Sequence, residues 1–229
     1  MRFDLHVHTA ENDIVVTKDA PEIVKMYHEK GYEGLVITNH FFSLSLEWYR
    51  NILRGASHEK MIDHYLKGYR NAKITGDALG MVVLLGTELR FDNTSNDYLV
   101  FGIDEDFLYN APMLNTLTLD KFLKIMPENS LIYQAHPFRN NMTITKPEKL
   151  FGIEVYNGGT PKDRNEFARM WADMHNLRKI SGSDYHLPKH LARGGVDFFN
   201  RVETNDELVA QLRSGRYTLI EFGKGAAND

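Results

Sequence analysis

The sequence predicts an α/β protein, folded as a closed barrel of parallel strands with helices on its outer face. Three observations lead to this prediction. A strand followed by a helical segment recurs about seven times along the 229 residues. The strand segments are nearly continuous apolar runs, which is typical of strands covered on both faces. Several of them end in a side chain that can bind a metal ion, and functional groups of such barrels gather at the C-terminal mouth of the strands.

The first strand carries the clearest metal-binding pattern. Side chains alternate along a strand, so Asp4, His6 and His8 are expected on one face and the apolar residues between them on the other. Two imidazoles placed two residues apart can share one metal ion. Asp13 lies in the turn that follows, from which a carboxylate can bend back toward the same place. The alternative is a half-buried strand whose polar residues face outward.

A helix and a second strand come next. Asp19 and Glu22 form the N-terminal capping signal of a helix that ends near Gly31. An apolar run over residues 34–38 then leads to His40. A histidine at a strand end is often structural, but His40 occupies the same kind of position as the histidines of the first strand.

The middle of the chain adds two carboxylates. Residues 44–79 are predicted to be helical, in two pieces broken near Gly55. The apolar run over 80–88 reads as a strand that ends in Glu88, which is a metal ligand or a solvated loop residue. A further short strand over 97–103 begins with Asp97, which is a ligand or a strand-capping residue.

The last part of the chain repeats the pattern. A strand over residues 130–136 ends in His136, and a short strand from residue 178 is followed by Asp184 and His186. A final helix begins at Thr204 with a capping box. The remaining predicted elements are a helix over 118–126, a strand over 152–157, a helix over 162–177 and a closing strand over 216–222.

Composition narrows the class of protein. The hydrophobic share of 42% and the charged share of 25% are ordinary for a globular domain, and we expect a single domain over residues 1–229. The net charge of -4 indicates no surface for nucleic acid. No apolar run spans a membrane and no signal-peptide pattern is visible, so we expect a cytoplasmic protein. With no cysteine present, a metal site must use nitrogen and oxygen ligands.

The polar strand ends have structural explanations one at a time, but their number favours a metal site. They match a known family in order and local sequence: DLHVHT at 4–9, ITNH at 37–40, GTE at 86–88, AHP at 135–137 and GSDYH at 182–186. Over nearly its whole length the chain resembles the PHP (polymerase and histidinol phosphatase) family. The resemblance implies a distorted seven-stranded (β/α) barrel, similar to a TIM barrel, that holds two or three divalent ions at its C-terminal mouth.

The resemblance also implies how the ligands are shared. Histidine and carboxylate ligands admit zinc, manganese or iron. Glu88 would bridge the first ion to a second. The first ion would be held by His6, His8, Glu88 and Asp184, the second by Glu88 and His136, and the third by Asp13, His40 and His186.

Two positions depart from the family pattern. Asn39 precedes the motif histidine where the family usually has aspartate, which weakens a carboxylate behind the ligands rather than a ligand itself. No histidine lies between Glu88 and His136, where some members supply one. Asp97 is the replacement that we expect for it.

These ligands suit hydrolysis of a phosphate monoester of a small metabolite by metal-activated hydroxide. Through the resemblance, histidinol phosphate is the leading substrate candidate. Glu88 would act by bridging the ions, and Asp184 or His186 would pass a proton to the leaving group. The alternatives are a phosphatase or phosphodiesterase acting on nucleotides or short oligonucleotides, and a barrel that binds metal without catalysis.

A phosphorylated substrate also requires a cation. Arg139, three residues after His136, is the first candidate for binding phosphate, and Arg164 and Arg193 are weaker ones. Each has an ordinary surface role as its alternative. A nucleotide would need aromatic stacking surfaces, for which the candidates are Tyr98, Phe138, Tyr156 and Tyr185.

Overall fold

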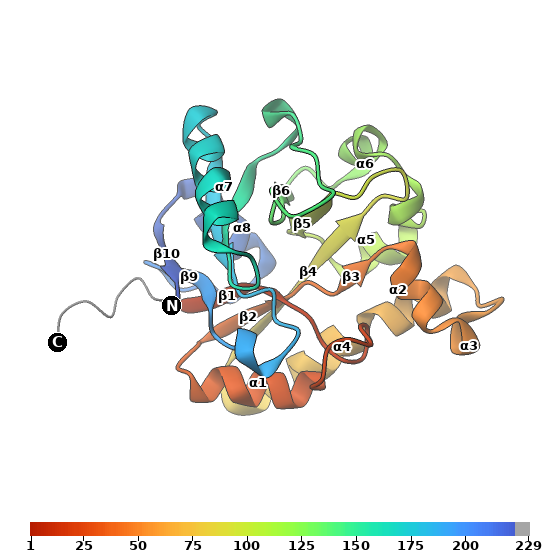
Figure 1. Cartoon of the computed structure of the whole chain (residues 1–229). Coiled ribbons are helices and arrows are strands. Elements are labelled where there is room, and N and C mark those ends of the chain that lie inside the picture. Colours follow the sequence, from red (N-terminus) through yellow and green to blue (C-terminus); the bar gives the residue numbers. More distant parts are fainter. Residues whose placement is uncertain (223–229) are drawn as a thin grey trace.

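One curved sheet of ten strands organises the computed structural model, which describes residues 1–222 (Figure 1). Residues 223–229, the end of the predicted single domain, lie outside the described residues. The strands are β1 (Arg2–Val7), β2 (Gly34–Ile37), β3 (His40–Phe41), β4 (Val82–Arg90), β5 (Asp97–Phe101), β6 (Leu131–Gln134), β7 (Gly152–Asn157), β8 (Arg178–Gly182), β9 (Gly194–Phe198) and β10 (Tyr217–Glu221).

Seven strands form a nearly closed ring. The pairing order is β10-β9-β1-β2-β4-β5-β6-β7-β8, with β3 paired to β4. A parallel bridge between Val7 and Tyr185 joins the residues after β8 back to β1. At the other end of β1, β9 pairs antiparallel with Arg2 and Phe3, and β10 pairs with β9. The predicted distorted seven-stranded barrel is therefore confirmed, and the strand β9, which was not predicted, is inserted beside its seam.

The direction of β5 differs from the prediction of an all-parallel barrel. β5 runs antiparallel to both β4 and β6. Only residues 91–96 connect β4 to β5, and a parallel crossover needs a dozen or more residues, so the chain has to turn back. Because of this reversal the first residue of β5, Asp97, lies at the edge where the parallel strands end.

The alternation predicted for the first strand is also wrong in part. Phe3 and Leu5 pack in the apolar cluster inside the barrel, but Val7 packs on the outside with helix α1 (Ala20–Glu29). The pairing of β1 with β2 shifts register between Asp4 and Val7, which turns the strand. Asp4 consequently bonds to Tyr27 of α1 and does not share the direction of the two histidines.

The helices follow the predicted pattern, with one addition. Asp19 caps α1 by accepting from the Glu22 backbone, and Thr204 and Glu207 form the expected capping box. The predicted helical stretch over 44–79 forms three pieces instead of the expected two: Gly55, with a φ of 71°, lies in the expected break, and a second break falls at Tyr49. The helices after α1 are α2 (Ser43–Trp48), α3 (Arg50–Leu53), α4 (His58–Leu79), the unpredicted α5 (Glu105–Asn110), α6 (Leu119–Ile125), α7 (Lys162–Met174) and α8 (Asn205–Ser214).

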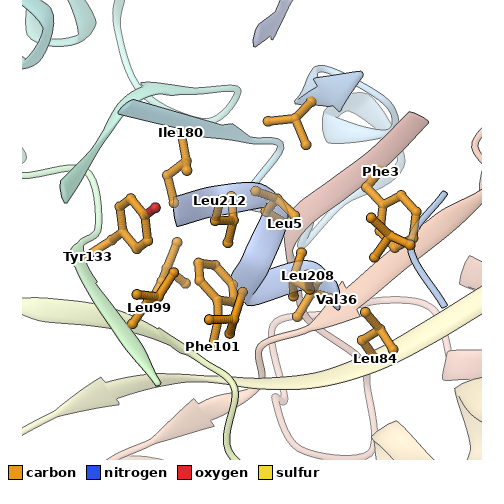
Figure 2. Packing of buried hydrophobic residues seen from close by; sticks show 14 of the residues in the cluster. Phe3, Leu5, Val36, Leu84, Leu99, Phe101, Tyr133, Ile180, Leu208 and Leu212 are labelled. Atoms are coloured by element: carbon orange, nitrogen blue, oxygen red, sulfur yellow. The ribbon is translucent and has the colours of Figure 1, made fainter. Parts of the chain in front are cut away.

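The apolar core fills the barrel away from its C-terminal mouth. Figure 2 shows Leu208 and Leu212 of α8 lying among side chains from strands around the ring. These side chains include Leu5, Leu99, Phe101, Tyr133 and Ile180. The core leaves the mouth to polar side chains. Within residues 1–222, no helix is both long and apolar enough to cross a bilayer.

Candidate metal centre

The structure brings all nine predicted ligands together at the mouth of the barrel. They come from the end of β1, the loop after it, the start of β3, the strands β4 and β5, and the segments that follow β6 and β8. They form three groups, in each of which the ligand atoms lie within 4.8 Å of one another. The groups are His6, His8, Glu88 and Asp184; Glu88, Asp97 and His136; and His8, Asp13, His40 and His186.

Glu88 lies at the centre of these groups. Its Oε1 is 2.9 Å from His136 Nε2, whereas its Oε2 is 2.8 Å from His40 Nε2 and 3.2 Å from His8 Nε2. The same Oε2 is 3.4 Å from His6 Nε2. The two oxygens of one buried carboxylate thus face different histidines, which is the geometry that a ligand bridging two ions requires.

Asp184 completes the first group. Its Oδ1 is 3.4 Å from His8 Nε2 and 3.5 Å from His6 Nε2. Its Oδ2 accepts from Asn157 Nδ2 at 3.2 Å and pairs with Arg139. Oδ1 is therefore directed at the two histidines, whereas Oδ2 is held by Asn157 and Arg139.

Two of the ligand residues have backbone conformations that are unfavourable for side-chain-bearing residues. Asp184 has a φ of 53° and His136 a φ of 28°. Such conformations cost of order 1–3 kcal/mol and persist where surrounding contacts enforce them, often at functional sites. The strain is consistent with side chains that are held in place for a purpose other than packing.

The third group is organised by Asp13. Its Oδ2 is 2.9 Å from His40 Nδ1 and 3.3 Å from His186 Nε2, and its Oδ1 accepts from the Val15 backbone at 2.8 Å. His186 Nδ1 lies 3.0 Å from the carbonyl oxygen of Asp184. This group is the most open of the three, since His40 and His186 are 13% and 18% exposed.

The donor atoms fit divalent metal ions. Buried polar atoms without a hydrogen-bond partner are costly, and native interiors contain few of them. Nitrogen and oxygen donors of this kind suit zinc, manganese or iron. Several such atoms lie in this cluster, namely His6 Nε2, His8 Nδ1 and Nε2, His136 Nδ1 and Asp184 Oδ1.

The electrostatics of the mouth favour added positive charge. Burial raises the pKa of Glu88, but the His6 and His40 imidazoles outweigh it and hold that pKa well below its usual range. Burial lowers the pKa of His40, and the Glu88 carboxylate more than reverses this and raises it to about 9. In the same way Asp184 and Asp13 overcome burial and raise the pKa of His186 to about 10. The carboxylates therefore attract cations, and divalent ions compete there with protons.

Asp97 is already paired with a cationic side chain. Its two oxygens accept from Arg90 Nε at 2.6 Å and Arg90 Nη2 at 2.7 Å. Its Oδ2 lies 3.9 Å from His136 Nε2. The Asp97 side chain is only 2% exposed, so the ion pair is shielded from water on that side.

The Asn39 side chain holds the loop that leads to Asp13 rather than a candidate ligand itself. Its Oδ1 accepts from the Thr9 backbone at 2.9 Å and its Nδ2 donates to Asn12 Oδ1 at 2.8 Å. Both halves of the amide are thus used to hold the segment that leads to Asp13. An aspartate here would lack the donor.

Sequence reasoning missed Glu154 as part of the site. It is fully buried, its Oε1 is 2.9 Å from His6 Nδ1, and its Oε2 accepts from the His136 backbone at 3.0 Å. The available signal was a lone carboxylate inside the apolar strand over residues 152–157, where an unpartnered charge is costly.

The three candidate phosphate-binding arginines lie in different surroundings. Arg139 pairs with Asp184 and donates to Thr160 Oγ1 at 3.4 Å, so it is at the cluster. Arg164 donates to the Phe138 carbonyl and to Asn140, and it braces the loop that carries Arg139. The Arg193 guanidinium lies 4.7 Å from the centre of the Phe222 ring and lines a separate cavity of about 340 Å³.

The predicted stacking residues are mostly structural. Tyr98 is 3% exposed, and its hydroxyl is 2.9 Å from Thr145 Oγ1. Tyr185 is fully buried in the cluster beneath α1. Tyr156 donates to the Phe222 carbonyl at 3.4 Å, and Phe138 packs on Phe167 with ring centres 5.9 Å apart. Tyr98 and Tyr185 therefore cannot act as stacking platforms.

Comparison with known proteins agrees with this architecture. Residues 162–217 match the family model described as PHP-associated. No curated protein sequence matches the chain.

Solved structures resemble nearly the whole chain at low sequence identity. A two-domain Bacteroides vulgatus ATCC 8482 protein containing a predicted PHP-like metal-dependent phosphoesterase is 16% identical, with a TM-score of 0.71 over 96% of this chain. This chain spans 64% of that protein's length. PsfC from Pseudomonas syringae PB-5123 is 15% identical, with a TM-score of 0.69 over 97% of this chain and 91% of its own. A Bifidobacterium adolescentis ATCC 15703 protein assigned as a metal-dependent phosphoesterase is 16% identical, with a TM-score of 0.56 over 92% of this chain and 95% of its own.

Proposed function

We propose that the chain is a metal-dependent phosphoesterase of the PHP domain family, which the match of residues 162–217 to the PHP-associated model and the structural likeness to PHP-like phosphoesterases support. The observation that carries this proposal is the position of Glu88, whose two oxygens face His136 on one side and His6, His8 and His40 on the other. Divalent ions bound at this cluster would lower the pKa of water from 15.7 toward about 7 and neutralise charge on a phosphoryl group.

Arg139 is the residue that we assign to the phosphoryl oxygens. Its side chain is 39% exposed and its guanidinium contacts Asp184, so one edge is fixed at the cluster while the rest faces the mouth. A guanidinium can grip phosphate with two parallel hydrogen bonds. Arg164 holds the loop that carries it, and we assign no direct substrate contact to Arg164 or Arg193.

While no ion occupies the third group, His186 is the better placed of the two candidates for passing a proton to the leaving group. It is 18% exposed, whereas Asp184 is 4% exposed and is held by Arg139 and Asn157. His186 Nδ1 is anchored at the Asp184 carbonyl, which leaves Nε2 on the side of Asp13 and the mouth.

The substrate that we propose is a phosphate monoester of a small metabolite, with histidinol phosphate as the leading candidate through the family resemblance. The net charge of -4 gives no attraction for a nucleic acid chain. A mononucleotide is the second candidate, because Trp48 lies beside His40, with its ring centre 6.4 Å from that of His40. Such a ring can stack on a base.

Phosphate release from a panel of phosphorylated metabolites tests the proposal. The protein would be loaded with Mn²⁺ or Zn²⁺, its metal content measured, and the panel would contain histidinol phosphate, mononucleotides and a dinucleotide. We expect fastest release from a small monoester. Preference for nucleotides would replace the first substrate class with the second. Absence of release from a protein that holds two or more ions would overturn the proposal and leave a barrel that only binds metal.

A further inference from the structure

A single buried carboxylate lies directly behind two ligands that belong to different metal groups. Glu154 is fully buried within β7. Its Oε1 is 2.9 Å from His6 Nδ1, and its Oε2 accepts from the backbone of His136 at 3.0 Å and from Asn157 Nδ2 at 2.9 Å. His6 belongs to the first group and His136 to the second, so Glu154 contacts both sides of the pair that Glu88 joins.

We propose that Glu154 is a positioning residue that sets the proton on His6 and the backbone of His136, and so prepares both metal positions together. The inference rests on the metal centre of the proposed function. It assigns to Glu154 no contact with an ion or with a substrate.

His6 is the first of the two candidate ligands that Glu154 contacts. A carboxylate only accepts hydrogen bonds, so the neutral imidazole facing it carries its proton on Nδ1. Nε2 then keeps its lone pair, and this atom lies 3.4 Å from Glu88 Oε2 and 3.5 Å from Asp184 Oδ1. Pairing of a ligand histidine with a carboxylate through its other nitrogen fixes the ring and strengthens the ligand.

His136 is the second candidate ligand that Glu154 contacts. Its φ of 28° lies outside the conformations that residues with side chains favour, so neighbouring contacts must hold it. Its backbone N–H points to Glu154 Oε2, and its Nε2 reaches Glu88 Oε1 at 2.9 Å. Loss of the hydrogen bond to Glu154 would free the backbone to relax and would withdraw the ring from Glu88.

Close packing keeps Glu154 in this position. A Cβ atom on Gly182 of β8 would lie 2.4 Å from His6 Cβ and 2.9 Å from Glu154 Oε1. The backbone of β8 therefore passes directly against this pair and restricts where the carboxylate can move.

Glu154→Gln is the sharpest test, because it keeps the shape of the side chain and replaces one acceptor oxygen with an NH₂ donor. The position of Oε2 faces two donors, from His136 and Asn157, so the amide oxygen belongs there. The amide NH₂ then faces His6 Nδ1, and the His6 proton must move to Nε2, on the metal side. We expect affinity for Mn²⁺ or Zn²⁺ to fall about 10- to 100-fold, with the apo protein still folded.

Titration calorimetry and elemental analysis measure this effect without any turnover. Nitrogen-15 NMR of the histidine rings reports the His6 proton on Nδ1 in the wild type and on Nε2 in the variant. Glu166→Gln, which removes an exposed carboxylate from α7, is the matched control and should bind as the wild type does. Glu154→Asp, which keeps the acceptors on a shorter stem, should recover part of the affinity.

The possible failures are distinguishable. A wild-type protein that binds no metal would overturn the proposed function itself. A Glu154→Gln protein with wild-type affinity and stoichiometry would overturn only the positioning of His6, because the amide oxygen keeps the hydrogen bond from the His136 backbone. If that variant does not fold, the wild-type spectrum decides, because a neutral His6 ring whose single proton is on Nε2 contradicts the assignment.

Discussion

The first and second metal groups share Glu88 but differ in how their other carboxylate is engaged. In the first group Asp184 keeps Oδ1 without a hydrogen-bond partner and directs it at His6 and His8. In the second group both oxygens of Asp97 are taken by Arg90, and the nearer approach to His136 is 3.9 Å. The first group also has four members and the second only three.

This difference shows that proximity and availability are separate conditions for a metal site. A guanidinium on both oxygens of a carboxylate competes with a cation for the same charge. We therefore expect unequal affinities, with the first group filled at lower metal concentration than the second. Substitutions at Glu88, Arg139, Asp97 and Arg90 test this inequality.

Glu88→Gln should disrupt metal binding by both groups, because it removes the carboxylate that they share. We expect loss of both ions. The fall in phosphate release should exceed the roughly 10- to 100-fold loss that follows removal of a contact behind a metal ligand. Metal content and turnover of an aryl phosphate measure the effect, with circular dichroism to check the fold. A fully active Glu88→Gln protein would contradict the bridging role.

Arg139→Ala should alter substrate binding over the first group. Loss of a charge-assisted contact costs about 1.5–3 kcal/mol, so we expect KM for a phosphate monoester to rise roughly 10- to 100-fold. Arg164→Ala, which only removes a brace of the same loop, is the control and should have a smaller effect. An unchanged KM in Arg139→Ala would remove this residue from the substrate site.

Asp97→Asn should affect the second group alone. The variant keeps the size of the side chain but loses the negative charge at His136. We expect one equivalent of weakly bound metal to be lost, while the tightly bound equivalent stays, as measured by calorimetric titration. Loss of the tight equivalent instead would show that the two groups are not separable in the way proposed here.

Arg90→Gln should have the smallest effect and the opposite sign. Its side chain is 34% exposed, so its pairing with Asp97 is partly screened and contributes about 1 kcal/mol or less. Removing the competing guanidinium should raise affinity for the weaker ion a few-fold. A decrease would mean that Arg90 orients Asp97 for metal binding rather than competing for it.

Local sequence alone determined the ligand types and their order along the chain. The residues His6, His8, His40, His136 and Asp184 adjoin apolar runs, and each run identifies its own strand whatever its neighbours are. The helix starts at Asp19 and Thr204 were predictable for the same reason, since a cap is an interaction over three residues.

Only the tertiary structure decided which of these groups face one another and which are already engaged. The reversal of β5 brings Asp97 to the mouth and to Arg90, and the barrel seam places Glu154 behind His6, 148 residues away in sequence. Such contacts depend on strand order, direction and register, which no short window contains. The candidate ligand set was thus readable from local pattern, whereas the inequality that we expect between the metal groups arises from long-range packing.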